Sequence, residues 1–244
     1  VWQNAKGIEG LNIPSAEDRY ATYKTLKTVP KEQLAWVIPS PQKHEFKGEY
    51  RTPSALNFNL DSFEMDVNFI SERLQEGLTI TVNSENNLDN NLSVIQNNSL
   101  GREAYRLQIS EDKIRIEASH STGVFYAFES LHQILLIAQN EEKGWPIITI
   151  EDAPRFENRG FMSDVARNFY PKEKLFQILD YMALYKLNRF DLKLTDDDGW
   201  RIEIPGLPEL TEVGGKRGYT KDENDRLIPM YGSGSGDQKS TGNG

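Results

Sequence analysis

The sequence has no cysteine and no long hydrophobic run. Without cysteine, the 244 residues contain no disulfide, no thiolate ligand for a metal ion and no cysteine nucleophile. A long aliphatic stretch, Ile134–Ala138, is still far shorter than the roughly 18 residues of a membrane-spanning helix. We therefore expect no insertion into a membrane.

Positive charge is also in short supply. Lys and Arg number 28 against 37 Asp and Glu, which gives a formal net charge of −9. Nucleic acids and anionic membrane surfaces attract proteins with the opposite balance, so neither is an expected partner. A neutral sugar polymer is compatible with this charge.

Histidine is rare, and its spacing does not predict a metal site. The three histidines, His44, His120 and His132, are scattered, and none has a second ligand at the spacing of a zinc site. We interpret all three as surface or structural residues. Neither a metal nor a cofactor is expected.

The chain divides by pattern into three parts. Residues 1–30 are polar and irregular and are interpreted as a linker from a preceding domain, with a helical turn that begins at the N-cap Ser15. Residues 31–150 are predicted to form an α+β domain. Residues 151–244 alternate strands and helices.

The α+β domain is expected to contain a sheet with one covered face. Tyr105, Leu107 and Ile109 alternate with polar residues, and Ile114 and Ile116 do the same in the next segment. The expected strands are 36–41, 78–82, 104–110 and 113–119, the covering helix is 121–138, and the Asn-rich residues 85–99 are expected to form a loop or a sheet edge.

The pattern of the last part of the chain predicts a strand, a helix and a second strand. A short apolar segment at 160–167, GFMSDVAR, is expected to form a strand that ends close to Asp164 and Arg167. An amphipathic segment at 171–186 follows, and the strand FDLKLTDDDGW then delivers Asp196 and its two neighbouring aspartates. In (β/α) barrels the chemistry lies at the C-terminal ends of such strands.

These two motifs resemble the start of the catalytic barrel of glycoside hydrolase family 20, the β-N-acetylhexosaminidases, and above all its bacterial chitobiase-like branch. The segments PSAEDRY at 14–20 and GREAYRLQISEDKIRIEASHSTGVFYAFESLHQIL at 101–135 resemble the preceding parts of that branch. The resemblance implies an α/β fold, with an accessory α+β domain followed by the first βα units of a (β/α)8 TIM barrel. It also implies hydrolysis of terminal β-linked N-acetylglucosamine or N-acetylgalactosamine.

The resemblance also implies site residues and binding partners. Arg167 would hold hydroxyls of the terminal sugar, Asp196 would line the sugar pocket, and Glu209 is a further pocket candidate. The expected partners are N-acetylhexosamine-terminated glycans or chitooligosaccharides. A secreted, periplasmic or outer-surface location in a bacterium is expected, as in the family.

The chain departs from the family pattern in two places. It contains no Gly-Gly-Asp-Glu, the context of the family's acid and its acetamido-orienting aspartate, so no catalytic residue is assigned. The part after Ile150 is less than half of the roughly 250 residues of a barrel, so the rest of the barrel is an expected partner. Asp191 and Lys193 replace two histidines. They share a strand face and could pair with each other, or they could alter the network that supports Asp196.

Alternative interpretations remain open for each of these features. Arg167 could be a surface arginine at a helix start, residues 196–198 could form a calcium loop or a simple turn with Gly199, and Trp200 could pack or stack on a sugar. The whole protein could be a non-catalytic glycan-binding or scaffold protein. A barrel enzyme for phosphorylated substrates would need a phosphate loop, and GSGSG at 232–236 lacks a following helix.

Overall fold

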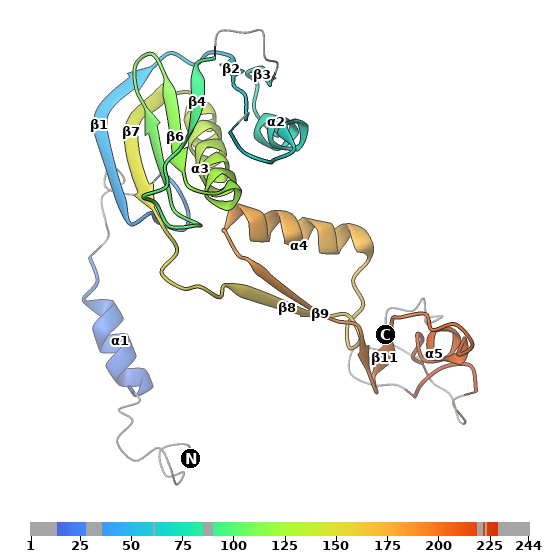
Figure 1. Ribbon diagram of the computed structural model, residues 1–244. Helices are drawn as coiled ribbons and strands as arrows, with labels where there is room; N and C mark the ends of the chain where they lie inside the picture. Colours follow the sequence, from blue (N-terminus) through green and yellow to red (C-terminus); the bar gives the residue numbers. More distant parts are fainter. Residues whose placement is uncertain are drawn as a thin grey trace. The chain divides into compact units, whose positions relative to one another are not determined.

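A computed structural model describes residues 14–27, 36–60, 62–84, 90–218, 222 and 224–228 (Figure 1). The chain forms two compact units, Val1–Ala35 and Trp36–Gly244. The expected loop at 232–236 lies outside the described residues. Among the described residues, no helix combines the length and the apolar character needed to cross a bilayer.

The first unit contains helix α1, Ala16–Lys24. The Ser15 side chain accepts a hydrogen bond from the Asp18 N–H at 3.1 Å, and the Asp18 carboxylate accepts one from the Ser15 N–H at 2.9 Å. This reciprocal cap satisfies two donors that a helix start leaves free. The predicted helix start at Ser15 is confirmed, and the helix is longer than the single turn expected.

The second unit begins with a five-stranded sheet in the order β1-β7-β5-β6-β4 (Figure 1). β7 pairs antiparallel with β1 and with β5, β5 pairs antiparallel with β6, and β4 runs parallel to β6. The strands are β1 Lys43–Arg51, β4 Leu92–Gln96, β5 Tyr105–Ile109, β6 Ile114–Ala118 and β7 Trp145–Asp152. Two short strands, β2 Leu56–Asn57 and β3 Val82–Asn83, form a separate parallel pair.

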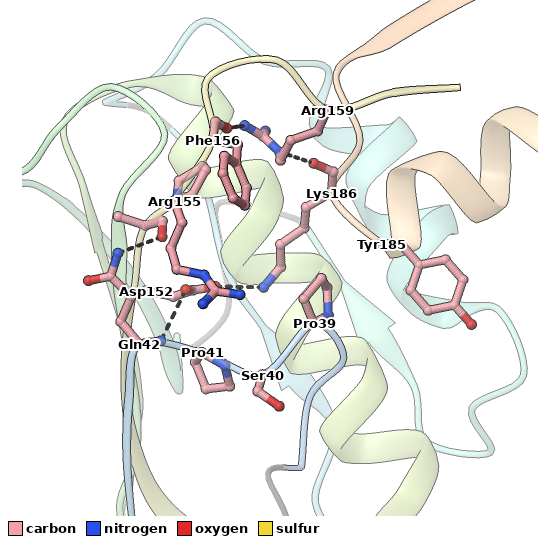
Figure 2. Close-up of a pocket in the computed structure, with 12 residues that line it drawn as sticks. Pro39, Ser40, Pro41, Gln42, Asp152, Arg155, Phe156, Arg159, Tyr185 and Lys186 are labelled. Atoms are coloured by element: carbon pink, nitrogen blue, oxygen red, sulfur yellow. Dashed lines mark hydrogen bonds and ion pairs between the residues drawn. The ribbon is translucent and has the colours of Figure 1, made fainter. Parts of the chain in front are cut away.

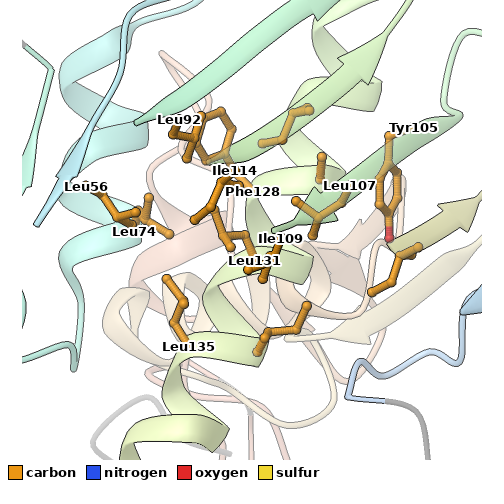
Figure 3. Close-up of a cluster of buried hydrophobic side chains, with 14 of the residues drawn as sticks. Leu56, Leu74, Leu92, Tyr105, Leu107, Ile109, Ile114, Phe128, Leu131 and Leu135 are labelled. Atoms are coloured by element: carbon orange, nitrogen blue, oxygen red, sulfur yellow. The ribbon is translucent and has the colours of Figure 1, made fainter. Parts of the chain in front are cut away.

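One face of this sheet is covered by helix α3, Ser121–Asn140, which contacts β5, β6 and β7 (Figure 1). Helix α2, Val67–Gln75, packs beside α3. Buried side chains from the sheet and from both helices meet in one hydrophobic core, which Figure 3 draws between Leu107 of β5 and Leu131 of α3. The predicted β5, β6 and α3 are confirmed, because apolar alternation in strands and apolar spacing in a helix are both consequences of burial on one side.

Two predictions for this region need correction, and a third is confirmed. Residues 36–39 are bends, with a cis peptide bond between Ile38 and Pro39, and the strand begins only at Lys43. Of 78–82, only Val82 lies in a strand. Within 85–99 the sheet edge expected as one of two alternatives is confirmed, because the edge strand β4 occupies 92–96, whereas residues 85–89 lie outside the described part. Pro39 and Pro41 lack the N–H that a sheet ladder requires, which explains the first error.

The unit ends in a strand, helix, strand arrangement, as predicted. β8, Gly160–Asp164, and β9, Arg189–Lys193, pair in parallel, and helix α4, Lys172–Leu184, connects them (Figure 1). The register places Asp164 opposite Lys193. A small hairpin of β10, Thr195–Asp196, and β11, Gly199–Trp200, and the short helix α5, Glu209–Glu212, follow.

Candidate functional site

Five charged side chains meet at the C-terminal ends of β8 and β9, and we call them the charged cluster: Asp164, Arg167, Lys193, Asp196 and Asp198. The Arg167 guanidinium lies at its centre. Its Nη1 is 2.9 Å from Asp164 Oδ2, its Nη2 is 2.9 Å from Asp196 Oδ2, and its Nε is 3.0 Å from Asp198 Oδ2. The parallel pairing of β8 with β9 brings these sequence-distant residues together.

Lys193 completes the cluster from β9. Its ammonium group donates a hydrogen bond to Asp196 Oδ2 and lies 3.6 Å from Asp164 Oδ2. Asp191, two residues earlier on the same strand, is exposed. Lys193 therefore does not pair with Asp191 among the described contacts. It contacts Asp196 and Asp164, which agrees with the alternative of an altered network around Asp196.

The charges of the cluster shift one another's protonation. The pKa of Asp196 lies well below its usual range, because the Asp197 carboxyl and then the Lys193 ammonium form hydrogen bonds with it. The same interaction with Asp196 raises the pKa of Asp197. The negative charge of Asp196 raises the pKa of Arg167. Asp196 is thus kept ionised, with positive charge on two sides.

The Arg167 guanidinium keeps access to solvent despite these contacts. Its side chain is 53% exposed, whereas that of Asp196 is 16% exposed. A guanidinium carries five N–H donors in a planar fork, and the contacts above use three of them. Arg167 can therefore present donors to a ligand while the carboxylates hold its plane.

A cavity of about 420 Å³ adjoins the cluster. Glu209, the first residue of α5, lies in its wall together with Asp196 and Trp200. The structure thus brings Asp196 and Glu209 to one cavity, with Arg167 bonded to Asp196 beside it. The indole Nε1 of Trp200 donates a hydrogen bond to the Ile202 carbonyl at 2.7 Å.

Two arginines that the sequence did not single out support the backbone at Arg167. Arg201 donates hydrogen bonds to the carbonyl of Val165 at 2.9 Å and to that of Gly215 at 2.6 Å. Arg217 is buried and donates to the carbonyl of Arg167 at 2.6 Å. Only the KR pair before a glycine marks Arg217 in the sequence, and no local pattern predicts a buried arginine.

Two family models match the chain. The domain 2 model of glycosyl hydrolase family 20 matches residues 35–153, and the catalytic domain model of the same family matches residues 156–237. The chain belongs to glycosyl hydrolase family 20.

Curated relatives of the chain include bacterial chitobiases and hexosaminidases. The chain is 50% identical over 131 residues to the N,N'-diacetylchitobiase of Vibrio harveyi, which covers 54% of this chain and 15% of that protein. It is 32% identical over 228 residues to a beta-hexosaminidase of Vibrio vulnificus, which covers 92% of this chain and 26% of that protein. The chain therefore spans about a quarter or less of these relatives' lengths.

Solved structures of the family have the same fold. The GH20 exo beta-N-acetylglucosaminidase of Vibrio harveyi, solved in complex with N-acetylglucosamine, is similar with a TM-score of 0.68 and 32% identity. The similarity covers 84% of this chain and 32% of that one. The predicted α/β class, an accessory domain followed by the start of a TIM barrel, is confirmed.

The acidic run of this family 20 chain forms a turn. Asp197 and Asp198 are the two turn residues of the hairpin between Asp196 and Gly199. Among the described residues, no group of three or more His, Asp or Glu side chains is placed to hold a metal ion. The turn interpretation of the run is therefore the one that agrees with the hairpin.

The three histidines have structural or surface positions, as predicted. His44 is exposed on β1, and the His120 side chain caps α3 by accepting from the Thr122 N–H at 3.2 Å. His132 is buried in α3, with its Nε2 2.7 Å from the Glu76 carbonyl.

A second cavity, of about 640 Å³, lies where the accessory sheet meets the segment after α4 (Figure 2). Lys186 is buried in its wall, and its Nζ lies 2.9 Å from both the Asp152 carboxylate and the Tyr105 hydroxyl. Burial lowers the pKa of Lys186 and raises the pKa of Tyr105 well above its usual value. These groups satisfy one another, so we assign them to the joint between the two domains.

Proposed function

We propose that the full-length protein is a β-N-acetylhexosaminidase that removes terminal non-reducing β-linked N-acetylglucosamine or N-acetylgalactosamine. By full-length protein we mean this chain together with the part of the catalytic domain that its relatives carry beyond the matched residues. In this proposal residues 1–30 are a linker, 31–150 the accessory domain and 151–244 the start of the barrel. Location outside the cytoplasm, secreted, periplasmic or at the outer surface, belongs to the same proposal.

The observation that carries the proposal is the half-exposed Arg167 guanidinium, held by three aspartates at the C-terminal ends of two parallel strands. A planar fork of donors suits two neighbouring sugar hydroxyls, and its orientation is maintained before a ligand binds. Asp196 and Glu209 would offer carboxylate acceptors to further hydroxyls in the adjoining cavity. We therefore assign Arg167, Asp196 and Glu209 to substrate binding.

The chemistry itself would use the substrate's own acetamido group. Family 20 enzymes belong to the substrate-assisted exceptions among glycosidases, so no protein nucleophile is needed. The acid and the acetamido-orienting aspartate lie in a Gly-Gly-Asp-Glu context that this chain does not contain. The chain would supply one wall of the sugar site, and the remainder of the barrel would supply the acid.

Exposed apolar side chains on β8 and α4 agree with a barrel that is completed by further βα units. Phe161 of β8 is 44% exposed, and Phe176 of α4 is 53% exposed. In a complete barrel, strands and helices are covered on both sides by neighbouring units. We propose that the remaining βα units cover these side chains and are the principal partner of this chain.

The test is an assay of the full-length protein on two aryl glycosides. An aryl N-acetyl-β-glucosaminide is expected to be hydrolysed, and the matching β-glucoside, which lacks the acetamido group, is not. The 244-residue chain alone is expected to hydrolyse neither, because general acid assistance contributes about 10² to 10⁴ in rate. Saturable glycan binding without turnover by the full-length protein would favour the non-catalytic alternative and overturn the proposal.

A further inference from the structure

We infer that Lys193 is a positioning residue, whose ammonium group holds the Asp196 carboxylate in place while Arg167 engages a sugar. This inference rests on the proposed function, because it assigns a supporting role at the same site. Lys193 approaches Asp196 from β9, three residues earlier in the chain. Arg167 approaches it from the turn after β8.

The two cations differ in what else they contact. Arg167 divides its donors among Asp164, Asp196 and Asp198. Among the described contacts, Lys193 donates to Asp196 and has one longer approach, of 3.6 Å, to Asp164. A ligand hydroxyl that competes for the Arg167 fork would therefore weaken the hold of Arg167 on Asp196, whereas the bond from Lys193 would remain.

Charge balance makes this hold necessary. Four aspartates, at positions 164, 196, 197 and 198, lie at the site, and among the described ion pairs Arg167 and Lys193 are the cations that contact Asp164, Asp196 and Asp198. With Lys193 the six side chains sum to −2 when all are ionised, and without it they sum to −3. Neighbouring like charges favour protonation of one carboxylate, so removal of Lys193 would raise the pKa of Asp196 and free its side chain to turn.

Lys193 is also less exposed than the arginine it assists. Its side chain is 35% exposed, against 53% for Arg167. The sugar would thus meet Arg167 first, and Lys193 would act through Asp196. A substrate effect of Lys193 should therefore appear as a binding defect transmitted by one carboxylate.

Kinetics on the full-length protein test the inference. Lys193→Met is expected to raise KM for an aryl N-acetyl-β-glucosaminide about tenfold to 100-fold, the equivalent of one charge-assisted hydrogen bond. Lys193→Arg, which keeps a cation, should restore most of the affinity. Lys174→Met is the matched control, because Lys174 is exposed on α4 and its side chain bonds only to Gln177 among the described contacts.

If Lys193 had a purely structural role, the kinetics of Lys193→Met would differ. Its loss would lower the melting temperature and the active fraction, so kcat would fall while KM stayed constant, and that result would overturn the inference. An unchanged KM in Lys193→Met at an unchanged melting temperature would overturn it as well.

A second measurement does not depend on activity. Carboxyl ¹³C titration of the 244-residue chain, with Asp196→Asn to assign the signal, should show a higher pKa of Asp196 in Lys193→Met and no change in Lys174→Met. An unchanged Asp196 pKa in Lys193→Met would overturn the inference. If the shift appears but the full-length protein has no glycosidase activity, the proposed function fails while the hold of Lys193 on Asp196 stands.

Discussion

Lys186 and Asp152 join the accessory domain to the first βα unit of the barrel. Asp152 is the last residue of β7, Lys186 follows α4, and their charged atoms lie 2.9 Å apart with both side chains largely buried. The Tyr105 hydroxyl bonds to both of them. Burial of this pair has a desolvation cost, so removal of one partner, which leaves the other charge buried and unpaired, should cost more than the pair itself contributes.

Replacement of the buried lysine should destabilise the protein. Lys186→Met leaves the Asp152 carboxylate without its cation, and we expect a loss of about 3 kcal/mol in the free energy of unfolding, measured by urea denaturation. Lys174→Met, at an exposed position, should change it by less than about 0.5 kcal/mol. Lys186→Met combined with Asp152→Asn should recover part of the loss. Equal stability of Lys186→Met and the parent would contradict the assignment of this pair to the joint.

A second ion pair at the same joint makes stability depend on pH. Arg159 donates to the Glu103 carboxylate at 2.8 Å, and this hydrogen bond is the main reason that the pKa of Glu103 lies below its usual value of 4.5. Because the folded-state pKa is depressed, the stabilisation is complete above about 4.5 and is lost as the pH falls through the folded-state value.

The Glu103→Gln variant isolates this pair. It should cost about 1 to 3 kcal/mol near neutral pH, and the difference from the parent should shrink in acid. Urea unfolding of both proteins at about pH 7 and about pH 3 measures the two differences. Glu111→Gln, in the exposed turn before β6, serves as control. If the stability difference between Glu103→Gln and the parent were larger at about pH 3 than at about pH 7, the assigned role of the Glu103–Arg159 pair would be wrong.

Close packing at the start of α3 predicts an unusual response to alanine. A Cβ on Gly123 would lie 2.4 Å from the Ala104 carbonyl oxygen, so the helix or β5 must shift. Gly123→Ala should lower stability by about 1 to 3 kcal/mol, although Gly to Ala in a helix normally gains about 1 kcal/mol. Gly101→Ala, where the nearest atom is 3.9 Å away, should be nearly neutral. A higher melting temperature for Gly123→Ala would refute the close contact.

The role of Arg167 is tested by a substitution that keeps its charge. Lysine cannot reproduce two parallel hydrogen bonds to neighbouring hydroxyls, so Arg167→Lys in the full-length protein should lower kcat/KM about tenfold to several hundredfold. The melting temperature should hardly change, because the side chain is half exposed. Arg102→Lys, at an exposed position, is the control. Normal kcat/KM in Arg167→Lys would remove Arg167 from the sugar site.

Local pattern was enough to predict much of the fold. β5, β6 and α3 were predictable because each buries one side and therefore repeats apolar residues at its own period. β8, α4 and β9 were predictable from apolar residues of the same kind, although most of those residues are exposed or half-buried among the described residues. β1 was missed because it is an edge strand with exposed residues along nearly its whole length. Its position depends on hydrogen bonds to β7, which leave no mark in its own sequence.

The candidate site, like the fold, could be predicted from the sequence only in part. The sequence by itself determined which residues carry the charge at the ends of two strands, since Arg167 and Asp196 stand directly after apolar runs. Only the tertiary structure decided their partners. The register of β8 with β9 puts Lys193 beside Asp164, and the hairpin after β9 turns Asp196 back onto the same lysine. Pairing of charges depends on distance in space, and residues as far apart in the chain as Arg167 and Asp198 meet only after the strands have paired.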